Sequence, residues 1–265
     1  MRPERIVIAS ATLLIASPAA AADDEPICAD RPGLATSSCT VPAGMVQVET
    51  GLVALVRDRS GGVRTDEVTL GETAIVYGVS DRLHIQLGLT PYTRVREREG
   101  GGGKRASGVG DLVLRLKYRL TSDDAPVQLA VNPFVKIPTA RRSIGNGKVE
   151  GGILVPMEWA VPRSALSLTL SPEVNLLADS EGSGHHLAIA QAVSLAAPLS
   201  SRLSFALDLW GQWDWDPAGR VRQYAIGPSA AYLLSNDLQV DAGVDFGLNR
   251  HTSDVTVYSG IAFRF

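Results

Sequence analysis

Four histidines are the side chains of this 265-residue sequence best suited to acid–base chemistry or metal binding: His84, His185, His186 and His251. His185 and His186 are adjacent in the segment GSGHHL, so together they could capture a metal ion at the surface. The sequence does not place carboxylates in register with this pair. A solvated pair in a loop is therefore the favoured interpretation, and we predict no metal site and no cofactor.

Hydrolytic chemistry would need a serine close to one of these histidines. His84 lies on the polar side of an alternating segment, whereas the other three lie in or beside polar, glycine-rich stretches. Ser259 lies on the apolar side of its own segment, but it has no obvious histidine partner. The sequence predicts that the protein is not an enzyme.

The segment EREGGGGKRASG has the glycines and the lysine of a phosphate-binding loop. Lys104 is followed by Arg105, however, where such a loop has Ser or Thr, and no strand-to-helix pattern surrounds it. We interpret the segment as a mobile outer loop whose cations could contact anionic lipopolysaccharide. The net charge of −3 over the whole chain gives no reason to expect a nucleic-acid partner.

Apolar and polar residues alternate through most of the chain, which is the pattern of β-strands with two different faces. In DLVLRLKYRL, for example, the leucines alternate with Asp111, Arg115 and Lys117. The second strand fits less well, because Glu72 falls on its apolar side. The pattern predicts twelve strands, at residues 45–56, 67–78, 82–92, 110–120, 126–137, 152–160, 164–177, 186–197, 202–212, 222–234, 238–248 and 255–265.

The connections between these strands differ in length at the two ends. Short turns such as GVSDR and PLSSR alternate with longer connections rich in charge and glycine, such as TARRSIGNGKVEGG. This layout is typical of an outer-membrane β-barrel. We therefore predict an all-β fold, a transmembrane up-and-down antiparallel β-barrel of about 12 strands with short periplasmic turns and longer extracellular loops.

A soluble sandwich or lipocalin-like barrel shows the same alternation, with its apolar face turned inward. Three features favour the membrane barrel. The polar face carries many charges, and the apolar stripe of the last strand continues to the terminal Phe265, which we predict to be a C-terminal assembly signal for the barrel-assembly machinery. Aromatic residues also gather at the strand ends, as in the girdles of membrane barrels. The predicted girdle residues are Tyr77, Tyr92, Tyr118, Trp159, Trp210, Tyr224 and Tyr232.

The charged face would line a lumen in this fold. Cations cluster on the fourth and fifth predicted strands and carboxylates on the ninth and eleventh, so barrel closure would place them on different walls and create a field across the lumen. The alternative is that these charges meet as salt bridges and seal it. The candidate lumen-lining residues are Glu49, His84, Arg115, Lys117, Arg119, Asn132, Lys136, Glu173, Asp208, Asp241 and Asp245.

The amino end has two arginines, a short apolar run and then small residues, which predicts a cleaved secretory signal peptide at residues 1–22. An uncleaved anchor would need an apolar run of ~20 residues. We predict a periplasmic segment at residues 23–43 and the barrel at residues 44–265. Because exported chains meet an oxidising environment, the two cysteines, Cys28 and Cys39, are predicted to form a disulfide closing a short surface loop. A zinc pair would need further ligands nearby.

Several phrases, in this order, resemble a family of outer-membrane transporters named for the meta-pathway (MetA-pathway) of phenol degradation. They are DRPG, CTVPAGMVQVETGL, YGVSDRLHIQLGLTPY, GVGDLVLRLKYRL, VKIPTA, LQVDAGVDFGLN and GIAFRF, and they span about Asp30 to Phe265. VEGGILVPMEWAV departs from the family pattern. The resemblance implies a barrel channel of Gram-negative bacteria for small compounds, aromatic ones among them.

We therefore predict a monomeric, passive channel in the cell outer membrane. Its expected partners are membrane lipid, lipopolysaccharide, the barrel-assembly machinery and a small-molecule solute. The alternative is a structural or surface-interaction barrel with a closed lumen. A conductance measurement would separate the two hypotheses.

Overall fold

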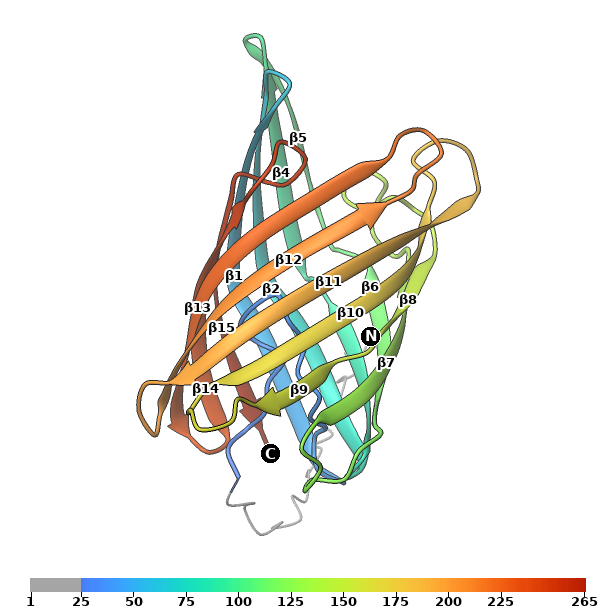
Figure 1. The fold of residues 1–265 in the computed structure, drawn as a ribbon. Helices are drawn as coiled ribbons and strands as arrows, with labels where there is room; N and C mark the ends of the chain where they lie inside the picture. Colours follow the sequence, from blue (N-terminus) through green and yellow to red (C-terminus); the bar gives the residue numbers. More distant parts are fainter. Residues whose placement is uncertain (1–24) are drawn as a thin grey trace, which may run out of the picture.

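The computed structural model describes residues 25–265, which form a β-barrel with both ends of the described chain at its lower rim (Figure 1). The predicted signal peptide at residues 1–22 lies outside the described residues. All strand pairs are antiparallel. No helix among the described residues has the length and apolar character required to cross a bilayer.

Fifteen strands make up the sheet. The first seven are β1 (Val46–Ser60), β2 (Val63–Ser80), β3 (Leu83–Leu89), β4 (Tyr92–Glu99), β5 (Gly102–Gly108), β6 (Leu112–Arg119) and β7 (Gln128–Ile137). The others are β8 (Glu150–Leu154), β9 (Met157–Ala160), β10 (Ser167–Ala178), β11 (His185–Pro198), β12 (Leu203–Asp214), β13 (Val221–Ser235), β14 (Leu238–Gly247) and β15 (Val255–Arg264).

Three of the barrel's spans are interrupted, so the fifteen strands form twelve spans. β3 and β4 both pair with β2 and are separated at Pro91. On their other side, β3 pairs with β6 and β4 pairs with β5. β8 and β9 lie between β7 and β10 and are separated at Val155 and Pro156. Because β1 pairs with both β2 and β15, the barrel is closed. The predicted fold and strand number are confirmed.

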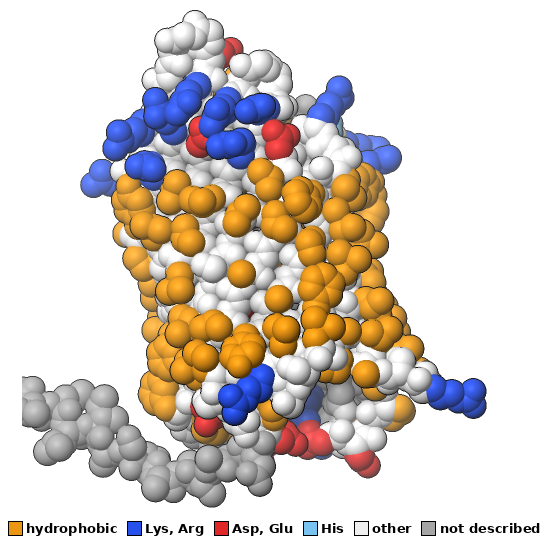
Figure 2. Space-filling view, turned by 90° about the vertical axis from the view of Figure 1, so that its left-hand side faces the viewer, with side chains coloured by type: hydrophobic (Ala, Val, Ile, Leu, Met, Phe, Trp, Pro, Cys, Tyr) orange, Lys and Arg blue, Asp and Glu red, His pale blue; other side chains and the backbone are white. Residues whose placement is uncertain are grey.

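The strand register places alternate residues outside and inside. In β6, Leu114 and Leu116 point outward and are 44% and 39% exposed. Lys117, which follows Leu116, points inward and is 1% exposed. Figure 2 shows outward hydrophobic side chains as a band across the face that is drawn, with Lys and Arg side chains gathered above it. A solvent-facing protein of this size rarely exposes so continuous an apolar surface, and a band of this kind matches the hydrocarbon layer of a membrane.

The interior is made of small and polar side chains. Its buried residues include Ala188, Ala190 and Ala192 of β11, together with Asn132 and Asp208. This arrangement is the inverse of a soluble β-barrel, in which large apolar side chains fill the centre. The sequence's charged face is therefore the lumen face.

A pair of irregularities in β1 and β2 explains why Glu72 falls on the apolar side in the sequence. The β1–β15 register shifts between Gly51 and Val53, and Gly71 in β2 has a φ of 71°. A bulge changes which face the following residues occupy. As a result, Glu72 lines a lumen cavity together with Gly51.

The predicted outer loop at residues 93–109 is instead a β-hairpin, formed by β4 and β5, that projects above the rim (Figure 1). Its tip contains Gly100 and Gly101, whose φ values of 51° and 89° suit a tight turn between two strands. The pairing of β4 with β5 is continuous from Thr93 and Gly108 to Glu99 and Gly102. The cations of this hairpin are Arg94, Arg96, Arg98, Lys104 and Arg105.

Candidate functional site

A stretch of the described chain that precedes β1 lies inside the barrel. We call residues 27–41 the plug segment. Its first residue, Ile27, donates its N–H to the carbonyl of Asn236 in the β13–β14 turn, and its last, Val41, donates to Nδ1 of His84 on β3. Figure 1 shows this segment in blue, rising into the lumen from the end that carries the short turns. The sequence predicted a periplasmic segment with a surface loop; its contacts instead place the segment between the barrel walls.

The tip of the plug segment turns at Gly33. Its φ of 109° is a conformation that residues with a side chain rarely adopt. A Cβ at this position would also collide with the carboxylate of Asp208 on β12. Glycine is therefore required both by the backbone and by the close approach of the tip to the wall.

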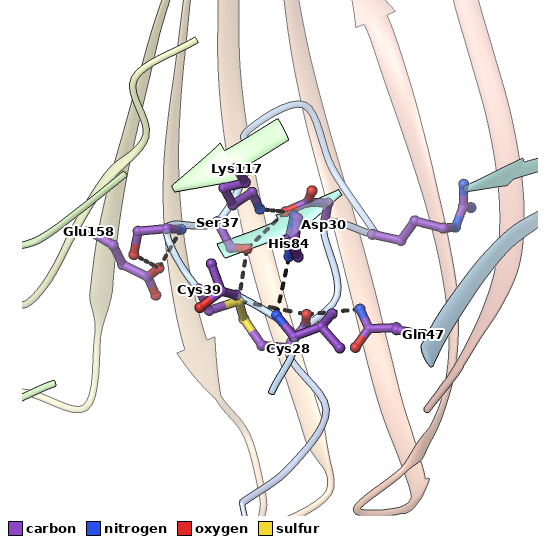
Figure 3. The surroundings of a disulfide bond; sticks show 12 residues. Cys28, Asp30, Ser37, Cys39, Gln47, His84, Lys117 and Glu158 are labelled. Carbon is purple, nitrogen blue, oxygen red and sulfur yellow. Dashed lines mark hydrogen bonds and ion pairs between the residues drawn. A yellow bond between two sulfur atoms is a disulfide. The ribbon is translucent and has the colours of Figure 1, made fainter. Parts of the chain in front are cut away.

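Two neighbouring plug residues of opposite charge bind opposite walls of the lumen. Asp30 accepts a bond of 2.7 Å from Nζ of Lys117 on β6. Arg31 contacts Asp241 on β14 through two bonds, with Nη2 3.0 Å from Oδ1 and Nε 3.3 Å from Oδ2. Figure 3 shows Lys117 and Asp30 facing each other. The charged walls predicted from the sequence therefore hold the plug segment and do not pair directly with each other at these positions.

The environment of Asp30 favours its ionised form. Burial alone would raise the pKa of Asp30, but the charge and hydrogen bond of Lys117, together with His84 and Ser37, outweigh burial and lower the pKa below its ordinary value. Ser37 also donates its hydroxyl to Oδ1 of Asp30 at 2.8 Å. An ionised Asp30 is the partner that a buried lysine requires.

Further bonds fix the backbone of the plug segment. Glu49 on β1 accepts the N–H groups of Asp30 and Arg31, each at 3.2 Å. Asp208 accepts the N–H of Leu34 at 2.5 Å. These carboxylates were predicted as lumen residues from their parity, and the structure places both against the plug segment.

On the β9–β10 side the plug segment has fewer contacts. Ser171 on β10 accepts the N–H of Thr36 and donates to its carbonyl, at 3.1 and 3.0 Å. Glu158 on β9 accepts from the hydroxyl of Ser38 at 3.2 Å (Figure 3), and only β7 separates β9 from β6, the strand of Lys117. Charged contacts therefore dominate on one side and hydroxyl contacts on the other.

Cys28 and Cys39 are joined in a disulfide, with their Cα atoms 6.4 Å apart. The bond closes the base of the plug segment, where Gln47 donates to the carbonyl of Cys28 at 3.0 Å (Figure 3). Cys28 lines the cavity at the short-turn mouth of the barrel. The disulfide therefore belongs to the lumen structure rather than to a free surface loop.

The other predicted lumen residues lie above or below the plug segment. Near the long-loop end, Lys136 pairs with Asp111 at 3.5 Å and with Glu150 at 2.7 Å. Arg115 lies over the ring of Phe134 at 5.0 Å. The remaining members are Arg119, which pairs with Asp123 in the β6–β7 turn, the buried Asn132, the half-buried Glu173, and Asp245, which lines a cavity above the plug tip.

Six of the seven predicted girdle residues lie on the outward face. Tyr77, Tyr92, Tyr118 and Tyr232 are between 36% and 45% exposed, and Trp159 and Tyr224 are half-buried near their strand ends. Trp210 is the exception, because it is paired with the buried Ala192 and Ala225 and shares the inward face of Asp208. The prediction relied on its position near a strand end. The alternation of β12, which gives Trp210 the same parity as Asp208, would have placed it on the inward face.

The histidine pair also differs from the sequence interpretation. His186 is 2.9 Å from Asp179 and 2.8 Å from Asp214, so carboxylates lie beside it although the sequence spacing did not indicate them. Asp214 comes from the neighbouring strand, which only the sheet register reveals. Within residues 25–265, no group of three or more His, Cys, Asp or Glu side chains has the arrangement of a metal site.

Sequence reasoning missed the role of Asp30 and Arg31. Both stand in the phrase DRPG, between the cysteines, and the opposite charges of neighbouring residues were the available signal. It also missed Glu72 and Glu158 as residues of the lumen cavities. Glu158 follows the interruption at Pro156, where alternation is hardest to count.

Solved structures share this architecture. An outer membrane channel from Pseudomonas putida F1 has a TM-score of 0.70 and 15% identity, covering 89% of this chain and 99% of the other. The translocator domain of the autotransporter NalP from Neisseria meningitidis has a TM-score of 0.55 and 13% identity, covering 85% and 90%. The β domain of the Bordetella autotransporter BrkA has a TM-score of 0.54 and 13% identity, covering 84% and 100%. At these identities the likeness shows the fold, which is that of outer-membrane barrels.

No curated protein matches the chain in sequence. The model of one protein family, described as "Putative MetA-pathway of phenol degradation", matches residues 29–265. The match covers both the plug segment from its third residue and the complete barrel. This chain is therefore an outer-membrane-type β-barrel that belongs to the MetA-pathway of phenol degradation family.

Proposed function

We propose that this protein is a passive outer-membrane channel for small organic solutes, narrowed by its own plug segment. The observation that carries the proposal is a closed barrel with an apolar exterior and a lumen lined by segregated charges. By the usual layout of such barrels, the short-turn end faces the periplasm and the projecting β4–β5 hairpin faces outward. Selectivity arises from the charged lumen and the outer loops, and the protein carries out no chemistry.

The family description names phenol degradation, which supports small organic compounds, including aromatic ones, as solutes. A polar substituent on the solute is needed for the lumen charges to act on it, because a purely apolar solute gains little from a transverse field. The cations of the β4–β5 hairpin suit contact with anionic lipopolysaccharide, and Phe265 suits recognition by the barrel-assembly machinery. The proposed working form is a monomer.

A sealed structural barrel is the competing function, and the plug segment favours it. Asp30, Arg31 and Leu34 all bond to wall residues, so the lumen is narrowed over the depth of the segment. The charges, in that case, would serve only to hold the plug segment. The two functions differ in whether solute crosses the barrel.

Conductance in planar bilayers tests the proposal. We expect discrete current steps from the wild-type protein, and larger steps from the double variant Asp30→Asn with Arg31→Gln, in which both ion pairs to the walls are lost. Swelling of liposomes in phenols and small organic acids or amines gives the second readout. If neither protein produces current steps or solute-dependent swelling, the sealed barrel is the correct function.

A further inference from the structure

A cavity of about 260 Å³ lies beside the plug segment, between it and the wall formed by β9 to β14. The wall side consists mainly of Ser, Thr and Ala side chains, among them Ser167, Ser194, Ala206 and Ser229. The plug side contributes residues from Cys28 to Pro32, together with Ala35 and Ser37. Because small side chains leave this space unfilled, the plug segment does not occupy the whole cross-section of the lumen.

This side cavity adjoins two others along the plug segment. It shares Cys28, Glu158 and Ser167 with the cavity at the short-turn mouth, whose volume is about 770 Å³. It shares Arg31 and Pro32 with a cavity of about 210 Å³ above the plug tip. The three spaces therefore follow one another from the mouth, past the plug segment, to the upper lumen. We call them together the side passage.

A buried hydroxyl points to a polar occupant of the side passage. Ser229 is 3% exposed and lines the side cavity, and its Oγ has no hydrogen-bond partner among the described residues. Buried polar atoms are normally satisfied by protein, water or ligand. Higher up, the Tyr258 hydroxyl and Oδ1 of Asp245 are likewise without partners among residues 25–265, and both residues line the cavity above the tip.

The charges along the side passage favour cations. Arg31, Arg119 and Arg264, which line it, are each paired with an aspartate. By contrast, Glu72, Glu158 and Asp245 form no ion pair with a Lys or Arg among the described residues. A cavity lined by unneutralised carboxylates in a low-dielectric wall concentrates cations and excludes anions.

We propose that small amines in their protonated form cross the barrel through the side passage while the plug segment remains in place. This inference rests on the proposed channel function and names its route and preferred solute. The side cavity is smaller than the ~300 Å³ at the lower limit of sites for drug-sized ligands, so it admits only small molecules. The plug segment then acts as a fixed constriction that selects by size and charge.

Cysteine labelling of the folded protein tests the route without changing how the chain folds. Ala206→Cys places a thiol in the side passage, and the native cysteines are already joined to each other. We expect a cationic methanethiosulfonate reagent to react about tenfold faster than an anionic one, and labelling to lower the conductance several-fold. The matched control is Leu207→Cys, next in the strand but facing lipid and 41% exposed, where labelling leaves conductance unchanged.

A second experiment holds the plug segment against the wall. Ser171 bonds to both the N–H and the carbonyl of Thr36, so Thr36→Cys with Ser171→Cys should form a cross-link there. We expect the oxidised double variant to conduct as the wild type does. The wild type treated with the same oxidant and reductant is the control for the native disulfide.

The outcomes separate this inference from the channel function. Loss of current on cross-linking, with recovery on reduction only in the double variant, would show that the plug segment must move, and would overturn the side passage while leaving a channel. Failure of Ala206→Cys to react, or conductance that is unchanged after complete labelling, would overturn it too. Preference for the anionic reagent would overturn the amine selectivity. Absence of current from every form, including the double variant Asp30→Asn with Arg31→Gln, would instead refute the channel function.

Discussion

At the scale of single residues, Asp30 and Lys117 illustrate why buried charges occur in pairs. Lys117 is 1% exposed, and its ammonium lies 2.7 Å from Asp30. Removing one partner of a buried ion pair costs about 3–5 kcal/mol, because the remaining charge stays out of water, whereas replacing both with apolar residues costs far less. The plug segment is held by fewer hydrogen bonds than the barrel strands. When one charge of the pair is removed, we therefore expect the segment to leave the wall and the barrel to stay folded.

The variant Asp30→Asn is therefore expected to release the plug segment and increase the conductance. The double variant Asp30→Asn with Lys117→Met should restore most of the wild-type behaviour, since no unpaired ammonium remains. Labelling of a cysteine introduced at Thr36 measures release directly, and single-channel recording measures its effect. Equal labelling in the wild type and Asp30→Asn would contradict a role for this ion pair in holding the segment.

At the scale of elements, β6 shows how one strand presents one face to lipid and the other to the polar lumen. Its outward leucines are among the exposed hydrophobic residues of the barrel, and its inward cations contact the plug segment or the lumen. The same alternation allowed the strands and the lumen residues to be predicted, because period two is visible in one sequence. It could not predict which lumen charges would meet, since that depends on contacts between residues as distant as Arg31 and Asp241.

Leu114→Arg is expected to destabilise the barrel in lipid by about 2–4 kcal/mol, because Leu114 lies near the middle of its strand on the lipid-facing side. Leu120→Arg, at the short-turn edge of the same span, should cost about 0–1 kcal/mol. Reversible urea unfolding in phospholipid vesicles gives both values. Similar costs at the two positions would show that the bilayer midplane is not where the apolar band places it.

At the scale of the whole molecule, the barrel closes where its two ends meet. The N–H of Phe265 donates to the carbonyl of Val46 at 2.9 Å, and the N–H of Val46 donates to the carbonyl of Phe265 at 2.8 Å. The Phe265 side chain is 65% exposed and stacks on Phe263, with ring centroids 5.8 Å apart. Backbone closure and side-chain exposure are thus separate properties of the last residue.

Phe265→Ala retains the backbone bonds and removes the ring. We expect it to lower the amount of protein assembled in the outer membrane several-fold, while refolding in detergent remains close to wild type. The control is Val257→Ala, which trims another outward residue of β15. Equal losses in cells and in detergent would assign Phe265 to barrel stability rather than to recognition by the assembly machinery.

The parts of the molecule that the sequence predicts are those governed by local periodicity. Twelve spans, their outward leucines and the two kinds of connection all follow from alternation and turn composition. The plug segment does not, since residues 27–41 have no period and their contacts come from strands spread along the whole barrel, from Glu49 on β1 to Asp241 on β14. Periodicity can also mislead within the strands. The inward direction of Trp210 follows from the register of β12, whereas that of Glu72 depends on a bulge that the sequence does not show.

The adjacency of Asp30 and Arg31 has a consequence for the depth at which the segment sits. If the segment slid by one residue, about 3.3 Å, either Arg31 would approach Lys117 or Asp30 would approach Asp241. Each displacement brings like charges together in a confined space, so both directions are penalised. The two neighbouring charges therefore fix the position of the plug segment along the barrel axis.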